Sequence, residues 1–194
     1  MNIIIENLES ELSKWLYYEY ENASKITEKN IIFTNVPYSW SKILAKLGKV
    51  FHSHVWEIFD PKDIIILDPQ AKAKLCKEDL IGKKAIVIGG ILGDNPPQGR
   101  TFKMLSSYAE GALLRNIGVW QFPIDGAVYV AYMVMNGKSL EDINVRKGLR
   151  IKIRLDNQFY NYYIVLPYAY PIENGRPVIN RKLIKYLIKR NLKS

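Results

Sequence analysis

The sequence has almost no cysteine, few acids for its basic content and no long apolar run. Cys76 is the single cysteine among 194 residues, which excludes an internal disulfide. The longest unbroken apolar stretch, 127–135, falls far short of the about 20 residues that span a bilayer. No basic segment followed by a long apolar core begins the chain, so we expect no signal peptide. These absences predict a cytoplasmic protein without a membrane segment.

Acids are outnumbered by cations, and the excess is unevenly distributed. Lys and Arg total 28 against 19 Asp and Glu, giving a net charge of +9. Segment 181–193 carries cations and no acid, and in 149–155 Arg150, Lys152 and Arg154 alternate with apolar residues, whereas 6–12 is acidic. This pattern favours a negatively charged partner, first RNA or a ribosome. The alternative is that the cations are simply solvated.

Strand-like and helix-like segments alternate along most of the chain. The expected strands are 2–5, 30–36, 63–68, 83–90 and 116–122, and the expected helices are 8–20, 39–48, 101–114 and 125–136, with 49–59 a strand or extended turn. This order predicts an α/β fold with a mostly parallel central sheet. Strand-like runs 149–155 and 159–166 and a basic helix 181–192 follow. We expect a core over 1–148 and a basic extension over 149–194, packed together as one domain.

A glycine-rich loop, GGILGDNPPQGRT, occupies 89–101, directly after a strand predicted to be covered on both faces. It matches neither the dinucleotide-binding nor the P-loop pattern. Its glycines allow close approach to a ligand, Pro96 and Pro97 stiffen its exit, and Thr101 is a candidate helix cap. Ligands of α/β sheets bind at the carboxyl ends of strands. The alternative is a tight strand-to-helix turn that holds no ligand.

Two other loops have the same character. LDPQA, 67–71, ends a predicted strand, and RNIGVWQFPIDGA, 115–127, joins a strand to a helix for which Asp125 is the candidate N-cap. The three loops together predict one pocket. A metal site is not indicated, because His52 and His54 share a strand face without an evident third ligand and Cys76 lies far away in sequence.

The two longer loops resemble the signature of a small family of SPOUT-class methyltransferases, whose best-known type is the arginine methyltransferase of a small-subunit ribosomal protein. The family pattern is G-G-I-L-G-D-x-P-P-x-D-R-T, followed by R-x-L-G-x-x-Q-M-T-T-D-T-A. The resemblance extends to IIENLESELSKWLYYEY, ILDPQAKAKLCKEDL and LPYAYPIENGRPVINRKLIKYL, and so covers nearly the whole chain. Two departures stand out: Gly99 replaces the aspartate of D-R-T, and FPIDGA lacks both threonines ahead of Asp125.

The resemblance implies an α/β sheet with a deep trefoil knot and S-adenosylmethionine bound by three knot loops. The cofactor-binding residues that it implies are Leu67, Asp68, Pro69, Gly89, Gly90, Ile91, Leu92, Gly93, Asp94, Asn116, Gly118, Val119, Gln121, Phe122 and Ile124. Many SPOUT enzymes dimerise through the knot, and the sequence leaves monomer and homodimer open.

Methyl transfer to a guanidinium nitrogen needs carboxylates, because this group is charged at neutral pH and must lose a proton. No metal is required, since a sulfonium methyl is already electrophilic. Asp94 and Asp125 lie on the implied cofactor loops and are the first candidates for catalysis. Glu6, after the first strand, and Glu19, on the apolar stripe of the first helix, are further candidates; Glu19 is equally read as a surface acid at a helix end.

Three functions remain open from the sequence. The first is a protein-arginine N-methyltransferase acting on a ribosomal protein, which suits an acidic pocket. The second is an RNA methyltransferase, in which Arg100, Arg150, Lys152 and Arg154 contact the substrate and the basic surface binds phosphates. The third is a cofactor-binding module without catalysis. A basic surface also suits an enzyme that docks on a ribosome to reach a protein, so charge alone does not separate the first two.

Overall fold

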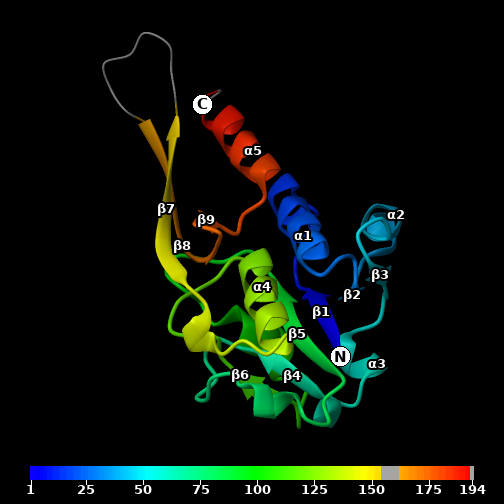
Figure 1. Ribbon diagram of the computed structural model, residues 1–194. Coiled ribbons are helices and arrows are strands. Elements are labelled where there is room, and N and C mark those ends of the chain that lie inside the picture. The colour runs from blue at the N-terminus through cyan, green and yellow to red at the C-terminus, as the bar shows by residue number, and fades with distance from the viewer. Residues whose placement is uncertain (154–161, 193–194) are drawn as a thin grey trace.

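A computed structural model describes residues 1–153 and 162–192 (Figure 1). Its centre is a sheet with strand order β3-β2-β1-β5-β4-β6, in which every pair of neighbours is parallel. The strands are β1 (Asn2–Asn7), β2 (Ile31–Thr34), β3 (Lys49–Val50), β4 (Ile64–Leu67), β5 (Ala85–Gly90) and β6 (Leu113–Arg115). The predicted α/β architecture with a mostly parallel sheet is therefore confirmed.

Each face of the sheet is covered, which explains why its strands are apolar at successive positions. On one face, α1 (Lys14–Ile26) and α4 (Ile124–Met135) pack on Ile3, Ile5 and neighbouring side chains. On the other face, α3 (Val55–Ile58) and a helical turn, Phe102–Ser106, pack on a smaller cluster that contains Ile4. Because side chains alternate along a strand, successive residues of β1 enter different layers.

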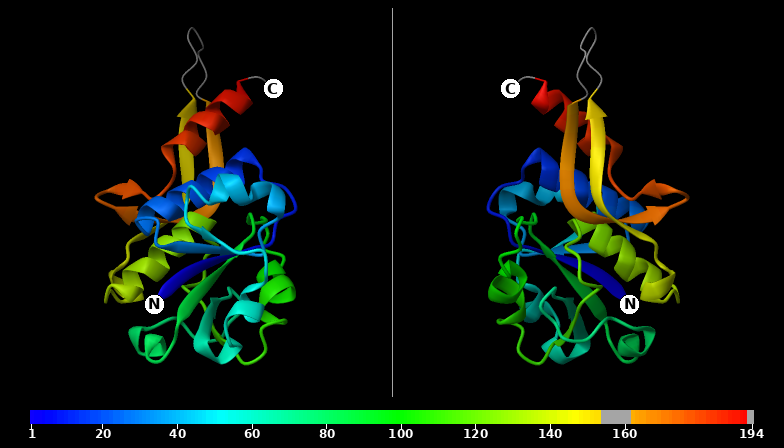
Figure 2. Two further views of the ribbon diagram at one scale, coloured as in Figure 1. Left: turned by 90° about the vertical axis from the view of Figure 1, so that its right-hand side faces the viewer. Right: turned by 90° about the vertical axis from the view of Figure 1, so that its left-hand side faces the viewer.

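A second, antiparallel sheet with order β7-β8-β9 follows the parallel one. Its strands are β7 (Val145–Ile153), β8 (Tyr162–Glu173) and β9 (Arg176–Pro177). Helix α5 (Arg181–Asn191) confirms the predicted basic helix, and its Leu183 and Leu187 pack against the hairpin and against α1. Figures 1 and 2 show the hairpin and α5 projecting together from the parallel-sheet layer. The boundary at residue 148 between the core and the C-terminal extension stays a prediction. Strand β7 begins before it, at Val145.

Two predicted elements are wrong. The expected helix 101–114 is only the turn Phe102–Ser106, because Gly111 adopts a φ of +93° and Leu113–Arg115 leaves to pair with β4. The expected strand 116–122 is a loop, since β6 ends at Arg115 and Gly118 has a φ of +118°. The edge strand therefore lies three residues earlier than expected, and the segment read as a strand is free to line a cavity.

Smaller differences concern the segment after β2. The expected helix 39–48 is a 3-10 turn, Tyr38–Trp40, continued by the short helix α2 (Ser41–Leu44). Segment 49–59 divides into β3 and α3 rather than forming one extended stretch. Among the described helices, none combines the length and the apolar character needed to cross a membrane.

Candidate functional site

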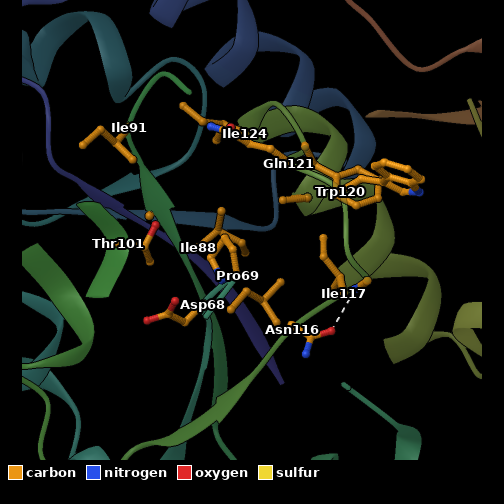
Figure 3. Close-up of a pocket in the computed structure, with 15 residues that line it drawn as sticks. Asp68, Pro69, Ile88, Ile91, Thr101, Asn116, Ile117, Trp120, Gln121 and Ile124 are labelled. Atoms are coloured by element: carbon orange, nitrogen blue, oxygen red, sulfur yellow. Dashed lines mark hydrogen bonds between the residues drawn. The ribbon is translucent and has the colours of Figure 1, made fainter. Parts of the chain in front are cut away.

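A cavity opens where the carboxyl ends of β4, β5 and β6 meet, and the segments that follow these strands line it (Figure 3). With its mouth, and with the open solvent there included, it encloses about 590 Å³ of empty space. Its lining residues are Leu67, Asp68, Pro69, Ile88, Gly89, Ile91, Thr101, Asn116, Ile117, Gly118, Trp120, Gln121, Phe122, Ile124 and Ala127. The three loops singled out in the sequence thus form one pocket.

Nearly all residues expected to bind a cofactor lie around this cavity. Leu92, Gly93, Asp94 and Val119 line an adjoining hollow at its mouth, which shares Pro69 and Gln121 and several other residues with it. Gly90 is the exception: a Cβ there would lie 2.3 Å from the Tyr20 hydroxyl oxygen, so it faces the core beneath α1.

Five lining residues were missed: Ile88, Thr101, Ile117, Trp120 and Ala127. All of them are immediate neighbours of predicted residues or lie within the same loops. Their proximity in the sequence to the predicted residues was the signal that could have identified them. The side chains of a loop do not alternate regularly, so the sequence does not show which of them face a cavity.

Hydrogen bonds fix the first and third loops to each other. The Asn116 side chain donates to the Ala71 carbonyl oxygen (2.8 Å) and accepts from Gly118 N–H (3.0 Å). Asp68 is buried, and its carboxylate accepts from Gln70 N–H (2.8 Å) and from the Ser106 hydroxyl (2.6 Å). The side chains of Asn116 and Asp68 therefore hold the shape of the pocket floor.

Hydrogen bonds join the second loop to β8 and to the third loop. The Tyr168 hydroxyl donates to the Gly93 carbonyl oxygen at 2.6 Å, and Ala169 N–H donates to the Gln121 carbonyl oxygen at 2.8 Å. When its amide is oriented to satisfy both groups, Gln121 donates to the Asp94 carbonyl oxygen (2.7 Å) and accepts from Asp94 N–H (3.2 Å). A Cβ on Gly93 would lie 2.3 Å from the Gln121 side-chain amide and 2.9 Å from the Tyr168 ring, so a larger residue would force both side chains to move.

Asp94 is the candidate catalytic acid that lines the mouth of the cavity. Its Oδ2 lies 2.6 Å from Arg100 Nε, and the Arg100 guanidinium also donates to the Leu92 carbonyl oxygen. Arg100, which was expected to contact substrate, instead binds Asp94 within its own loop. The side chain of Asp94 remains 42% exposed, so another cation can reach its carboxylate and replace Arg100 there.

Glu19 and Asp125 are buried behind the pocket wall at Ile124, with 3% and 1% of their surface exposed. Glu19 accepts from Ile124 N–H (2.8 Å) and from the Trp15 indole N–H (2.6 Å). Asp125 accepts from the Asn22 side-chain amide at 2.8 Å. The reading of Glu19 as a surface acid is wrong, because its helical stripe faces α4 rather than solvent. Asp125 is not the N-cap of α4 either, since it lies in the first turn after Pro123.

The environment of these two acids opposes their ionisation. Burial raises the pKa of Glu19 to about 7, although the hydrogen bond from Ile124 N–H acts in the opposite direction. Burial, and then the charge of Glu19, raises the pKa of Asp125 well above its usual value. Burial and the charges of Glu19 and Asp94 also raise the pKa of Tyr168. Glu19 and Asp94 thus act on the same tyrosine, next to the second loop.

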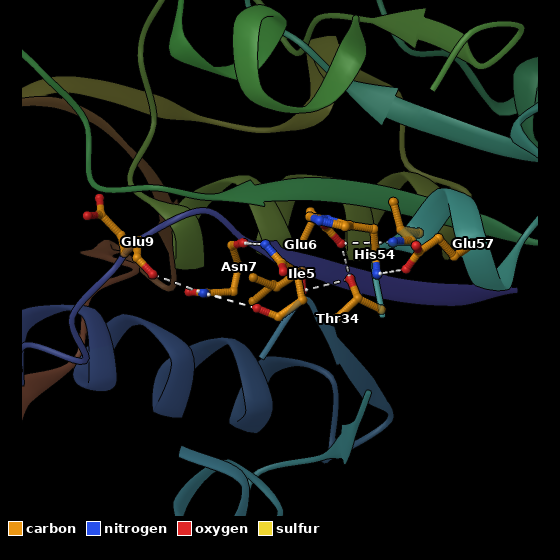
Figure 4. Close-up of polar contacts among 9 residues, drawn as sticks. Ile5, Glu6, Asn7, Glu9, Thr34, His54 and Glu57 are labelled. Atoms are coloured by element: carbon orange, nitrogen blue, oxygen red, sulfur yellow. Dashed lines mark hydrogen bonds and ion pairs between the residues drawn. The ribbon is translucent and has the colours of Figure 1, made fainter. Parts of the chain in front are cut away.

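Glu6 lies elsewhere (Figure 4). It is fully buried at the end of β1, but it accepts from the Thr34 hydroxyl and from Val55 N–H (3.1 Å), and its Oε1 lies 2.6 Å from His54 Nδ1. These contacts are on the face of the sheet covered by α3. Side chains alternate along β1, so Glu6 shares a face of the sheet with Ile4 and not with Ile5. Glu6 is therefore not brought together with Glu19 and Asp125.

The remaining sequence candidates are placed as follows. Arg150 and Lys152 lie on β7, paired with Val165 and Tyr163 of β8, whereas Arg154 lies outside the described residues. Thr101 makes no side-chain capping bond. His52 and His54 do not converge, since His54 binds Glu6 and His52 stacks on Tyr38. Over residues 1–153 and 162–192, no group of three His, Cys, Asp or Glu side chains has the arrangement to hold a metal ion.

The model of the family described as Protein arginine N-methyltransferase SFM1-like matches residues 2–194. The chain belongs to this family. The SFM1-like family is of the type that the loop motifs resemble, and the match spans the same extent of the chain.

Known members of the SFM1-like family agree closely in length and fold. Protein arginine N-methyltransferase SFM1 of Saccharomyces cerevisiae is 26% identical over 212 residues, covering 100% of this chain and 97% of the relative. The crystal structure of the yeast arginine methyltransferase SFM1 complexed with SAM has a TM-score of 0.84 at 25% identity, covering 100% and 92% of the two chains.

A likeness in fold alone extends to Trm10. The crystal structure of dual specific Trm10 from Thermococcus kodakaraensis has a TM-score of 0.58 at 17% identity and covers 73% of this chain and 96% of its own. These neighbours confirm the SPOUT type of α/β fold. The trefoil knot stays a prediction.

The departure from the SFM1-like motif at Gly99 has a local structural context. Gly99 has a φ of +65°, and a Cβ there would lie 3.0 Å from Gln70 Nε2. This left-handed turn precedes Arg100, whose guanidinium reaches back to Asp94. The glycine therefore suits a tight loop in which Asp94 carries the negative charge at the mouth.

Proposed function

We propose that this chain is an S-adenosylmethionine-dependent protein arginine N-methyltransferase that acts on a ribosomal protein in the cytoplasm. Its membership of the SFM1-like family supports the reaction, and solved structures of yeast SFM1 are complexed with SAM, SAH and MTA. The observation that carries the proposal is the joining of a mostly apolar, three-loop cavity with Asp94, Glu19 and Asp125 in a chain whose net charge is +9. This acidity is local and suits cationic reactants.

The pocket fits the proposed cofactor. Leu67, Ile88 and Phe122 give it apolar walls for an adenine ring, and the backbone of the three loops provides hydrogen-bonding groups around them. S-adenosylmethionine, when bound, supplies a methyl group on a positively charged sulfur. Asp94 at the mouth would stabilise that charge, and the charge would in turn favour the ionised forms of Glu19 and Asp125 behind Ile124.

Asp94 also has a proposed role towards the arginine that accepts the methyl group. Asp94 already binds a guanidinium, that of Arg100, with an Nε to Oδ2 distance of 2.6 Å. We propose that an arginine of the substrate exchanges with Arg100 at this carboxylate, which orients its nitrogen towards the cavity. One proton must leave that nitrogen when the new C–N bond forms, and Asp94 is the exposed carboxylate placed to accept it.

Titration calorimetry tests the cofactor assignment. We expect S-adenosylmethionine to bind with an affinity in the micromolar range and S-adenosylhomocysteine to compete with it. No heat at high protein concentration, under conditions in which the protein is folded, would overturn the enzyme assignment.

RNA methylation is the second candidate, and the basic outer face of the hairpin favours it. No ion pair joins Arg150 or Lys152 to an acid in the part of the chain that the structure describes, so both remain available for phosphates. Ribosomes incubated with the enzyme and methyl-tritiated cofactor separate the two functions. Release of the label by protease supports protein methylation, and release by RNase supports RNA methylation.

A further inference from the structure

A second groove lies beside the cofactor pocket, on the other side of the segment that carries Thr101. It runs between the loop after β1 and the turn Phe102–Ser106, with α3 beneath. Its walls include Leu8, Glu9, His54, Trp56, Met104 and Tyr108. None of these residues belongs to the pocket described above, and the proposed reaction does not use them.

The groove contains a column of stacked rings. The His54 and Trp56 rings lie 4.2 Å apart at 10°, and the Trp56 and Tyr108 rings lie 5.6 Å apart at 14°. Glu6 fixes the His54 ring from below through the 2.6 Å contact to Nδ1 (Figure 4). The outermost ring, that of Tyr108, is 64% exposed, which is unusual for an aromatic side chain that only fills a core.

One carboxylate and one cation line the groove among the described residues, and two further carboxylates lie next to it. Glu9 lines the groove, the exposed Glu57 binds the backbone N–H of His54, and Glu6 lies beneath it, whereas Lys103 is the one cation among the described residues that line the groove. Exposed aromatic faces next to carboxylates favour arginine and lysine side chains, which stack on rings and pair with acids.

The groove adjoins the mouth of the cofactor pocket at two points. Glu9 Oε1 accepts from Leu92 N–H at 2.8 Å, and Leu92 lines the mouth. Lys103 and Met104 follow Thr101, which lines the cavity itself. The groove and the pocket mouth are therefore neighbours along the same two segments, and the subsite needs an extended peptide, which advances about 3.3 Å per residue, to span them.

We propose that this groove is a substrate subsite, in which a basic residue that flanks the methylated arginine stacks on the Tyr108–Trp56–His54 column. The inference rests on the proposed function, since it assigns the groove to the same protein substrate. The occupant is a cationic, extended segment of protein, as ribosomal proteins commonly carry.

A peptide of alternating arginine and glycine, labelled with fluorescein, tests the subsite by fluorescence anisotropy without cofactor. We expect Tyr108→Ala to weaken binding about five-fold, as the loss of one exposed cation–π contact and its apolar surface predicts. Tyr108→Phe keeps the ring and should bind like wild type. Tyr38→Ala is the matched control, because Tyr38 is 81% exposed and stacks on His52 away from the groove.

Methyl transfer to the same peptide gives the second readout. Tyr108→Ala should raise KM about five-fold and leave kcat unchanged. Equal peptide binding by Tyr108→Ala and wild type would overturn the subsite. So would a labelled oligouridine, if Tyr108→Ala weakened its binding as much as it weakens binding of the peptide. A different result would show that the proposed function is wrong while the subsite is right. Wild type would then bind the peptide, Tyr108→Ala would bind it more weakly, and neither protein would methylate it.

Discussion

Among single residues, Glu19 has an environment far removed from that of a solvent-exposed acid. It lies on α1, buried against the start of α4, and both of its oxygens accept a hydrogen bond, from Trp15 and from Ile124. Its charge acts on Asp125 and Tyr170, whose pKa values are raised by burial and then by Glu19. A cationic reactant nearby would favour the ionised forms of Glu19 and Asp125, so we expect this buried pair to add negative charge at the pocket when such a reactant is bound.

The raised pKa of Glu19 predicts how stability depends on pH. The folded state holds this proton up to about pH 7, whereas an unfolded glutamic acid releases it near 4.5. Because the folded state binds more protons between these values, the free energy of unfolding falls as pH rises through this window, by about 3 kcal/mol. In Glu19→Gln this contribution should be lost and the fall should be smaller, because the buried Asp125 and Glu6, whose pKa values are also raised, still contribute. Urea unfolding at several pH values measures it, and equal slopes for both proteins would contradict the assigned environment.

At the pocket mouth, Asp94→Asn tests the proposed role of the exposed acid. The amide keeps the shape of the loop but neither accepts a proton nor pairs strongly with a guanidinium. We expect cofactor affinity to stay within about threefold of wild type and kcat to fall by about 10². Single-turnover transfer to an arginine peptide measures the second quantity; an unchanged rate would remove Asp94 from the mechanism.

The sequence located the pocket residues well but not every acid. Gly93, Gln121 and their neighbours were identified because two long motifs carry them. Glu6 was expected in the same pocket, and strand alternation places it on the opposite face, next to His54. That alternation is visible in NIIIEN, but which face holds the site depends on where α1 and α4 pack, and this is a tertiary fact.

At the scale of elements, β8 holds two of the pocket loops together. Tyr168 binds the second loop through its hydroxyl and Ala169 binds the third through its backbone. The hairpin is thus more than an appendage, because its base fixes the spacing between Gly93 and Gln121. The loop motifs contain no sign of this contact, since it joins residues about 75 positions apart.

Tyr168→Phe tests this coupling. It removes one hydrogen bond worth about 1 kcal/mol while keeping the ring, so we expect cofactor affinity to fall about fivefold with little change in unfolding temperature. Tyr163→Phe, on the exposed face of the same strand, is the control and should bind normally. Calorimetry with S-adenosylmethionine measures both; equal affinities would show that β8 does not hold the loops.

The wrong helix at 101–114 has a physical explanation at this scale. Its apolar residues serve two layers: Leu105 enters the core under the sheet, whereas Leu113 belongs to a strand that pairs with Ile65. Local spacing resembles a helix over the whole stretch, but backbone pairing at the sheet edge overrides it. Gly111, with its positive φ, marks the change.

For the whole molecule, the distribution of charge suggests two partners on two surfaces. Asp94 lies at the pocket mouth and Glu9 lines the aromatic groove, whereas Arg150 and Lys152 lie on a hairpin that projects from the sheet layer (Figure 2). Lys147, at the base of that hairpin, lies 4.3 Å over the ring of Trp120 at the pocket. A basic ribosomal protein that is bound to RNA would present both kinds of surface at once.

The combined variant Arg150→Gln/Lys152→Gln should separate docking from catalysis. We expect weaker binding to ribosomes, with the slope of log affinity against log salt reduced by about 1 to 2, and an unchanged kcat/KM on a free arginine peptide. Lys42→Gln/Lys46→Gln, which removes two exposed lysines of another surface, is the matched control. Sedimentation with ribosomes over a salt series measures binding; equal slopes in both variants would leave the hairpin without a docking role.

The proposed reaction, methylation of an arginine of a ribosomal protein, can be tested on intact ribosomes. The decisive measurement is tandem mass spectrometry of ribosomal proteins and digested ribosomal RNA, after incubation of ribosomes with the purified enzyme and S-adenosylmethionine carrying a deuterated methyl group. We expect a deuterated methyl group on an arginine side chain, absent with Asp94→Asn. A labelled nucleotide with unlabelled protein, or no labelled product at all, would contradict the proposed reaction.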